Sequence, residues 1–343
     1  MACGPDDFDL FPGLVATVEE PVLSVSLPLY RVTAEASGTV DALVYGEGGN
    51  NVYSIYYPVA EVHRYLARAP WPARRALHSA LAGLGRLTDR EFFWQAAHVA
   101  KIFAAEPDYR ESFFERLTSH FHFDRELRAE LLDPAFRGGA GMHRSFCEAA
   151  PRDEEFFDDL IALNITQGLK PYLLFFEHRM AAARGLALAA PFVSKKVVAF
   201  VNTLPRDWVV GGGTLAKLLR HRSSDRPFHK RALERVYPRD HVHRDPRLFY
   251  APYHSMFRER PAAAEKLLRA LKRRGWYDAR FLDRLFAEHR GQALHPRFNS
   301  RMRNHGQRLM ALLGCEVWAR LFLDGRRLGT QARTPIEDFL DLP

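Results

Sequence analysis

The chain has 343 residues, of which 47% are hydrophobic and 26% charged, a composition typical of a soluble globular protein with a substantial core. No apolar run is long enough to cross a bilayer, which argues against an integral membrane protein and leads us to expect a cytoplasmic one. The net charge of +8 attracts polyanions, but Lys and Arg are spread along the chain beside Asp and Glu, which argues against specific nucleic-acid binding.

A short apolar segment from Val40 to Tyr45 is the first predicted strand, and it leads into the glycine-rich turn GEGGNN. The backbone amides of Gly46, Gly48 and Gly49 could hold an anion in such a turn. The two residues that follow are asparagines, at positions 50 and 51, whose neutral carbonyls are weaker Mg²⁺ ligands than carboxylates. The pattern therefore raises the question of whether this is a working phosphate site or only its framework.

Most of the remaining sequence is helical in pattern. Thr88 and Glu91 have the spacing of a capping box, which predicts a helix beginning there, with an apolar stripe running to Phe103. A second apolar stripe runs from Leu309 to Val317, and we assign it to the core. The sequence predicts a small α/β part over residues 1–57, followed by a mainly helical remainder of the same domain over residues 58–343.

Three further patterns are candidates for chemistry. A second glycine-rich turn, VVGGGTLAKLLRHR, precedes a predicted helix that contains Lys217, but it lacks the Gly-Lys-Ser/Thr ending of a Walker A loop, and a plain turn is favoured. The segment DHVHRD places His241, His243 and Asp245 close together without the strand-rich surroundings of a metal hydrolase, so we predict no metal site. Three widely separated cysteines, Cys3, Cys147 and Cys315, predict reduced packing residues rather than disulfides.

Four segments, in this order, resemble the synthetase domain of the glutamine-dependent asparagine synthetase family. They are EEPVLSVSLPLYRVTAEA, GEGGNNVYSIYY, HRMAAARGLALAAPFVSKKVVAFVNTLP and RGWYDARFLDRLFAEHRGQ. The second corresponds to the GEGGDELFGGY-type loop of that family, and the third to its DRxSMAxxLExRxPFLDxxLVEFxxxLP segment. The resemblance implies a parallel-sheet fold of the adenine-nucleotide α-hydrolase type, in which ATP activates a carboxylate as an acyl-adenylate that ammonia then attacks.

The charged positions of the family pattern are mostly replaced. Glu47 keeps the glutamate that the resemblance implies is catalytic, whereas asparagines at positions 50 and 51 replace the acids that support magnesium and pyrophosphate. His178 stands where the family has an aspartate, and Lys217 lies one residue beyond the position of its phosphate-binding lysine. The other replacements are Ala187, Ala189, Ser194 and Pro246, whereas Leu186, Pro191 and Phe192 are retained. The resemblance implies that the apolar residues of segment 186–200, which include Phe192 and Phe200, are buried in the core.

The resemblance leads to three hypotheses. The nucleotide-binding PP-loop SGGxDS does not occur in the sequence. The first hypothesis is therefore a degenerate, non-catalytic accessory subunit of an ATP-dependent amide-forming system. A protein partner would cover the truncated α/β part. Such a chain needs no cofactor of its own. The second is one half of a split ligase, in which a partner completes a site for ATP and Mg²⁺ over Glu47. The third is a basic binding module for a polyanion.

Overall fold

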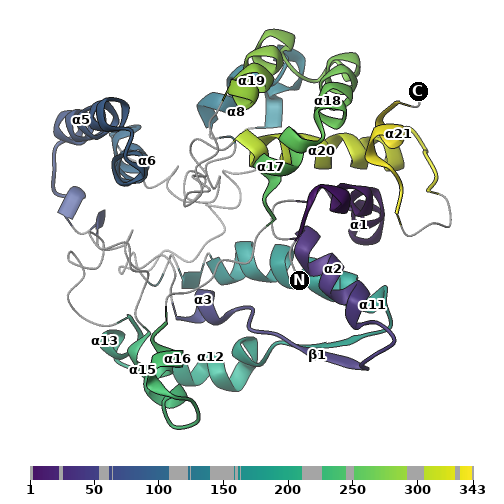
Figure 1. Ribbon diagram of the computed structural model, residues 1–343. Helices are drawn as coiled ribbons and strands as arrows, with labels where there is room; N and C mark the ends of the chain where they lie inside the picture. The colour runs from purple at the N-terminus through teal and green to yellow at the C-terminus, as the bar shows by residue number, and fades with distance from the viewer. Residues whose placement is uncertain are drawn as a thin grey trace.

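The computed structural model describes residues 3–22, 26–53, 62–63, 65–107, 123, 125–139, 158, 161–162, 164–210, 226–244, 251–291, 305–328 and 333–341. Helices dominate these residues, and their one sheet consists of two short parallel strands (Figure 1). This arrangement confirms the predicted fold, which is mainly α with a small α/β part.

The N-terminal part consists of short helices around one strand. A 3₁₀ helix, η1 (Pro5–Leu10), continues into α1 (Phe11–Val18), and α2 (Ser26–Ala36) leads to β1 (Ala42–Val44) and α3 (Gly49–Val52). Strand β1 confirms the strand predicted at 40–45, trimmed at both ends.

The partner of β1 comes from far along the chain. A π-helical segment, η3 (Asn164–Leu174), runs into α11 (Phe175–Ala182), and the chain then forms β2 (Ala187–Ala189). The strands are parallel, with Leu43 opposite Leu188, so the loops that follow them lie at the same edge of the sheet. One of these loops is the glycine-rich turn, and the other contains the 3₁₀ helix η4 (Pro191–Val193).

A helical hairpin is formed by α5 (Trp71–Thr88) and α6 (Glu91–Ala104). The capping box predicted at Thr88 is wrong. Thr88 is the last residue of α5, and its hydroxyl donates to the carbonyl of Leu84 over 2.7 Å rather than capping α6. The N-cap of α6 is Arg90, which makes no side-chain cap.

The other elements flank the sheet or build the C-terminal part. Helix α12 (Lys195–Asn202) lies next to the sheet, and α13 (Arg206–Val210), α15 (Pro227–Leu233) and α16 (Arg239–Val242) gather on the side of α12 away from β1. The C-terminal part contains α17 (Tyr253–Glu259), α18 (Pro261–Arg274), α19 (Ala279–Gly291), α20 (His305–Phe322) and α21 (Ile336–Asp341), and α8 (Arg125–Leu131) and the 3₁₀ helix η2 (Pro134–Gly139) adjoin α19.

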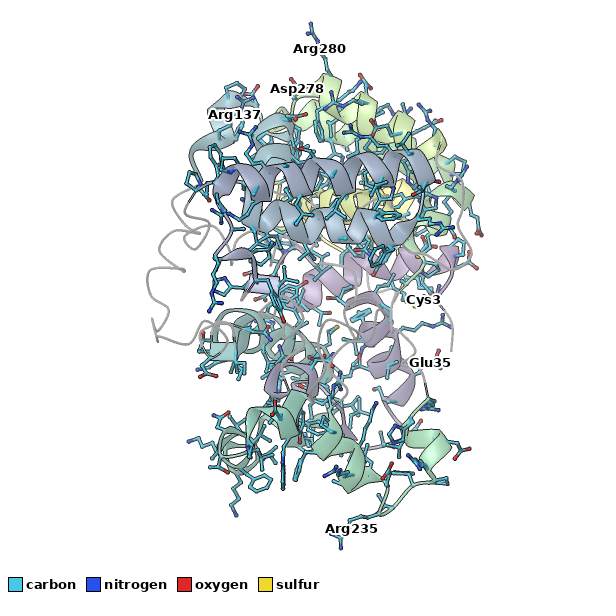
Figure 2. All side chains as sticks on the ribbon, turned by 90° about the vertical axis from the view of Figure 1, so that its left-hand side faces the viewer. Cys3, Glu35, Arg137, Arg235, Asp278 and Arg280 are labelled. Atoms are coloured by element: carbon cyan, nitrogen blue, oxygen red, sulfur yellow. The ribbon has the colours of Figure 1, made fainter. Side chains whose placement is uncertain are left out.

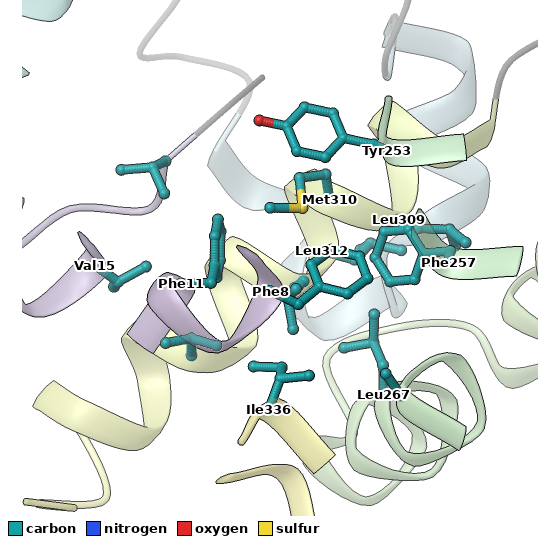
Figure 3. Close-up of a cluster of buried hydrophobic side chains, with 14 of the residues drawn as sticks. Phe8, Phe11, Val15, Tyr253, Phe257, Leu267, Leu309, Met310, Leu312 and Ile336 are labelled. Atoms are coloured by element: carbon teal, nitrogen blue, oxygen red, sulfur yellow. The ribbon is translucent and has the colours of Figure 1, made fainter. Parts of the chain in front are cut away.

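The main hydrophobic core lies around α20, and N-terminal and C-terminal residues share it (Figure 3). Phe8 from η1 packs on Phe257 from α17 with ring centroids 4.8 Å apart. The predicted stripe is confirmed as core, because its four residues, Leu309, Leu312, Leu313 and Val317, are all buried. Gly314 lets α20 approach the segment after α1 closely, because a Cβ at position 314 would lie 2.8 Å from the carbonyl oxygen of Val22.

A buried ion-pair network crosses this core. The Glu316 carboxylate, 1% exposed, accepts from the guanidinium of Arg274 at 2.6 Å and from that of Arg320 at 2.7 Å. Because the buried charges of Glu316 and Arg320 on α20 are paired, the free-energy penalty for burying them is offset.

Among the described residues, no helix is both long and apolar enough to cross a membrane.

Candidate functional site

The glycine-rich turn leaves the carboxyl end of β1 and begins α3. Gly48 has φ of 85°, in the left-handed region that favours glycine. A Cβ at Gly48 would lie 2.2 Å from Cγ1 of Val193, so the loop after β2 also requires glycine here. The predicted positions Gly46, Glu47, Gly48 and Gly49 therefore do form one tight turn at the edge of the sheet.

Two amides of the turn have partners within the turn itself. The Gly48 N–H donates to Oε1 of Glu47 over 3.3 Å, and the Gly49 N–H donates to the carbonyl of Gly46 over 3.3 Å. An anion bound at these amides would have to displace both bonds. This gives Glu47 a local structural role in the turn.

Aromatic and apolar side chains cover the turn. A Cβ at Gly49 would be in contact with the Phe192 ring, 3.5 Å from Cδ2, and that ring meets Tyr53 edge to face with centroids 6.3 Å apart. His229, from α15, stacks on Tyr53 with ring centroids 5.2 Å apart. The turn therefore lies against a packed layer formed by three separate segments.

The two asparagines after the turn differ in environment. Asn51 is buried, at 5% exposure, whereas Asn50 is exposed. The Arg226 guanidinium donates a hydrogen bond to Oδ1 of Asn50. Burial lowers the pKa of Arg226 from its ordinary value, and burial together with the nearby charge of Arg226 lowers the pKa of His229. The charge beside Asn50 is therefore positive, opposite to that of the family's acids.

The carboxyl group of Glu47, in the turn, is paired with that of Glu177. Glu177, on α11, is 5% exposed, and its pKa is raised to about 8 by burial and by the neighbouring Glu47 carboxylate. Burial also raises the pKa of Glu47. Burial and the Glu177 carboxylate raise the pKa of the Tyr45 hydroxyl. One of the two carboxyl groups therefore holds a proton near neutral pH, because two buried negative charges at one place repel each other.

The other candidate residues stand apart from this site. Lys217 and the glycines before it lie outside the described residues, as do Cys147 and Asp245. His243 bonds to Glu234 at 2.6 Å, and His241 stacks on Tyr237. No cluster of His, Cys, Asp or Glu in the described part of the chain is arranged to hold a metal ion. Cys3 and Cys315 are free thiols.

The structure adds residues to the site that the sequence did not single out. Glu177, one residue before His178, supplies the carboxylate that reaches Glu47, whereas His178 lines a separate hollow with Lys170 and Phe175. An acidic residue within the apolar stretch LLFFEHRM was the available signal for Glu177. The sequence holds no comparable signal for Arg226, because no sequence motif relates it to position 50.

The segment 186–200 is less buried than the resemblance suggested. Leu186 is 6% exposed, but Phe192 is only partly buried, and Phe200 is 52% exposed. The expectation that Phe200 belongs to the core is therefore wrong. This ring lies on the outer face of α12, where it meets Phe228 at 5.7 Å between centroids.

Comparison with family models matches residues 1–320 to the asparagine synthase family. Because the match spans most of the chain, the chain belongs to that family. No curated protein and no solved structure matches it significantly.

Proposed function

We propose that this member of the asparagine synthase family does not form an amide on its own and acts as an accessory subunit of an ATP-dependent amide-forming system. The observation that carries the proposal is the hydrogen bond from Arg226 to Asn50. It puts a guanidinium beside the residue that replaces a family acid.

Magnesium does not fit this arrangement. Mg²⁺ prefers charged oxygen ligands, and the oxygen that Asn50 offers is neutral and already accepts from a cation. A guanidinium within hydrogen-bond reach of the same oxygen would also repel the metal ion. The residues at this position therefore do not fit a magnesium ion.

The packing around the turn supports the same proposal. Phe192 and Val193 lie against Gly49 and Gly48, and two of the turn amides are engaged locally. A phosphate group needs free amides that it can approach. The turn serves instead as a packed junction between β1, α3 and the loop after β2.

A second candidate is one half of a split ligase, with ATP and Mg²⁺ held by a site that a partner chain completes. The pair Glu47 and Glu177 favours it, because two carboxyl groups that share a proton can accept and donate protons near neutral pH. In that case Glu47 would face the reacting groups.

Isothermal calorimetry with ATP in the presence and absence of Mg²⁺ tests the proposal. We expect no magnesium-dependent binding to the purified chain. The triple variant Asn50→Asp, Asn51→Asp, Arg226→Gln restores two acids and removes the cation, so it is the matched comparison. Micromolar, magnesium-dependent binding by the unaltered chain would refute the degenerate-site proposal.

The accessory role has its own test. The chain is deleted from cells that contain its genomic neighbours, and amide product is measured. Loss of product, together with the absence of ATP binding by the isolated chain, fits an accessory subunit, whereas unchanged product contradicts it.

A further inference from the structure

A groove of about 340 Å³ lies between α13 and α15. It is at the end of the molecule that carries Arg235, opposite the end that carries Arg280 (Figure 2). We infer that this groove binds an acidic segment of a partner protein that also carries large apolar side chains. The inference holds whether or not the chain can bind ATP, since none of the residues that line the groove belongs to the glycine-rich turn.

The floor of the groove is aromatic and open to solvent. Trp208 is 52% exposed, and its ring stacks on that of Phe228 with centroids 6.5 Å apart. Phe200 extends this surface beside Phe228, and Val236 and Tyr237 continue it beyond the end of α15, at 72% and 51% exposure. Large apolar side chains gathered in this way on a soluble protein mark an interaction surface.

The rim of the groove is basic. Arg231 and Arg235 line it, both are exposed, and neither forms an ion pair with another described residue. Arg231 lies on α15 and Arg235 in the turn just after it, so two like charges line the same groove, which is unfavourable unless a negative group joins them. A carboxylate-bearing partner supplies that group.

The surrounding helices have the same sign of charge. Ranges 195–210 and 226–244 contain nine Lys and Arg against three Asp and Glu, a net charge of +6 out of +8 for the whole chain. Elsewhere the remaining 40 Lys and Arg are balanced by 38 Asp and Glu, so basic residues occur along the whole chain but most of the net positive charge lies here. Such a patch attracts acidic partners and speeds their association.

A protein segment fits the groove better than a nucleic acid does. Asp207 is also among the lining residues, and a peptide can direct separate carboxylates to Arg231 and Arg235 and an apolar side chain toward Asp207, whereas a nucleic acid carries a phosphate at every nucleotide. The exposed Val236 adds an aliphatic surface, which suits a Leu or Phe side chain and offers a base no hydrogen bond.

A peptide-display selection tests the inference. The full chain is immobilised and presented with random peptides of about 12 residues, a length that spans one groove. We expect the selected peptides to be enriched in Asp and Glu together with Leu, Phe or Trp, and their affinity, measured by fluorescence anisotropy, to fall as salt is raised.

Variants locate the binding. Arg235→Glu and Trp208→Ala should each lower the affinity for the best peptide at least about tenfold, because charge reversal and loss of a central aromatic group are costly at interfaces. Arg280→Glu is the matched control at the far end of the molecule and should change affinity less than about twofold. Arg231→Glu provides a second exposed position if Trp208→Ala fails to fold, as judged by circular dichroism.

Three outcomes would overturn the inference. Selection could yield no acidic and apolar consensus. The selected peptides could bind Arg235→Glu and Arg231→Glu as well as the unaltered chain. Single-stranded RNA could compete for the same groove more tightly than any peptide, which would identify it as a nucleic-acid surface.

Discussion

Arg226 and Asn50 are 176 residues apart in the sequence, and the guanidinium of the first donates a hydrogen bond to the side-chain oxygen of the second. The contact joins the start of α15 to α3, directly after the glycine-rich turn. It also gives the neutral residue at position 50 a structural use, because an amide oxygen accepts from a guanidinium without needing a metal ion.

Asn50→Asp should therefore stabilise the fold. The carboxylate converts a hydrogen bond to Arg226 into an ion pair at an exposed position, a gain of about 0.5–1 kcal/mol. Asn50→Ala, which removes the acceptor, should cost about 1 kcal/mol. Urea denaturation at neutral pH measures both. Destabilisation by Asn50→Asp would mean that Arg226 does not interact with this side chain in solution.

Gly48→Ala should be strongly destabilising. The substitution puts a Cβ at a backbone φ of 85° and 2.2 Å from Cγ1 of Val193, so strain and overlap together should cost about 2–4 kcal/mol. Gly46→Ala is the control, since a Cβ at Gly46 has no atom within 4 Å, and it should cost less than about 1 kcal/mol.

Val193→Ala tests the cause of that loss. If the overlap with Val193 matters, Gly48→Ala should cost less in the Val193→Ala background, with a coupling energy of about 1 kcal/mol in a double-mutant cycle of denaturation measurements. Strict additivity would show that the loop after β2 does not lie on the turn.

Local patterns predicted much of the fold, because they depend on neighbouring residues. The strand before the turn, the glycines of the turn and the stripe from Leu309 to Val317 are of this kind. The capping box at Thr88 failed because α5 extends to that residue, and spacing alone does not tell a helix start from the end of the preceding helix.

The rest of the site depends on tertiary contacts that no local pattern encodes. Strand β2 has only three residues, too few for an alternating pattern to be recognised. Glu177 faces Glu47 only because α11 packs with a particular rotation. Arg226 contacts Asn50 although the two residues are 176 positions apart in the sequence. The exposure of Phe200 likewise follows from which face of α12 is turned outward.

The Glu316 network should be a large source of stability in the C-terminal core. Glu316→Ala leaves the guanidinium groups of Arg274 and Arg320 without their buried partner and should cost about 3–5 kcal/mol. Asp324, which meets Arg274 at 2.6 Å from a largely exposed position, is the control. Asp324→Ala should cost about 0–1 kcal/mol in the same denaturation assay. Equal losses from the two variants would contradict the burial argument.

Stability should fall as pH rises through the neutral range because of Glu177. Its folded-state pKa is raised from its ordinary value of 4.5 to about 8, so the folded chain binds a proton that the unfolded chain has released between these values. The contribution is complete below the lower value and is lost as pH approaches the upper one, at up to about 1.4 kcal/mol per pH unit.

Glu177→Gln isolates that contribution. It keeps the shape of the neutral side chain and cannot ionise, so its free energy of unfolding should depend less on pH than that of the unaltered chain. Glu47→Gln should have a smaller effect of the same sign, because it removes the charge that helps raise the pKa of Glu177. Parallel pH profiles for all three proteins would show that Glu177 titrates normally.

Glu47→Gln also separates the two candidate functions. In an accessory subunit Glu47 serves the turn, where its Oε1 accepts from the Gly48 amide, and glutamine retains an acceptor oxygen there. Product formed by cells that contain the chain and its genomic neighbours should then be nearly unchanged. In a split ligase the same substitution removes a carboxylate from the reacting centre, where losing a general acid or base costs about 10²–10⁴ in rate.

The control for this experiment is Asp324→Asn, a carboxylate-to-amide change in the C-terminal part of the chain, which should leave product unchanged in either case. A loss of a hundredfold or so with Glu47→Gln, with folding intact by circular dichroism, would favour the split ligase, because a turn hydrogen bond worth about 1 kcal/mol cannot account for it. Unchanged product, combined with loss of product on deletion of the whole chain, would favour the accessory subunit, since the chain would then be needed for something other than its one retained family glutamate.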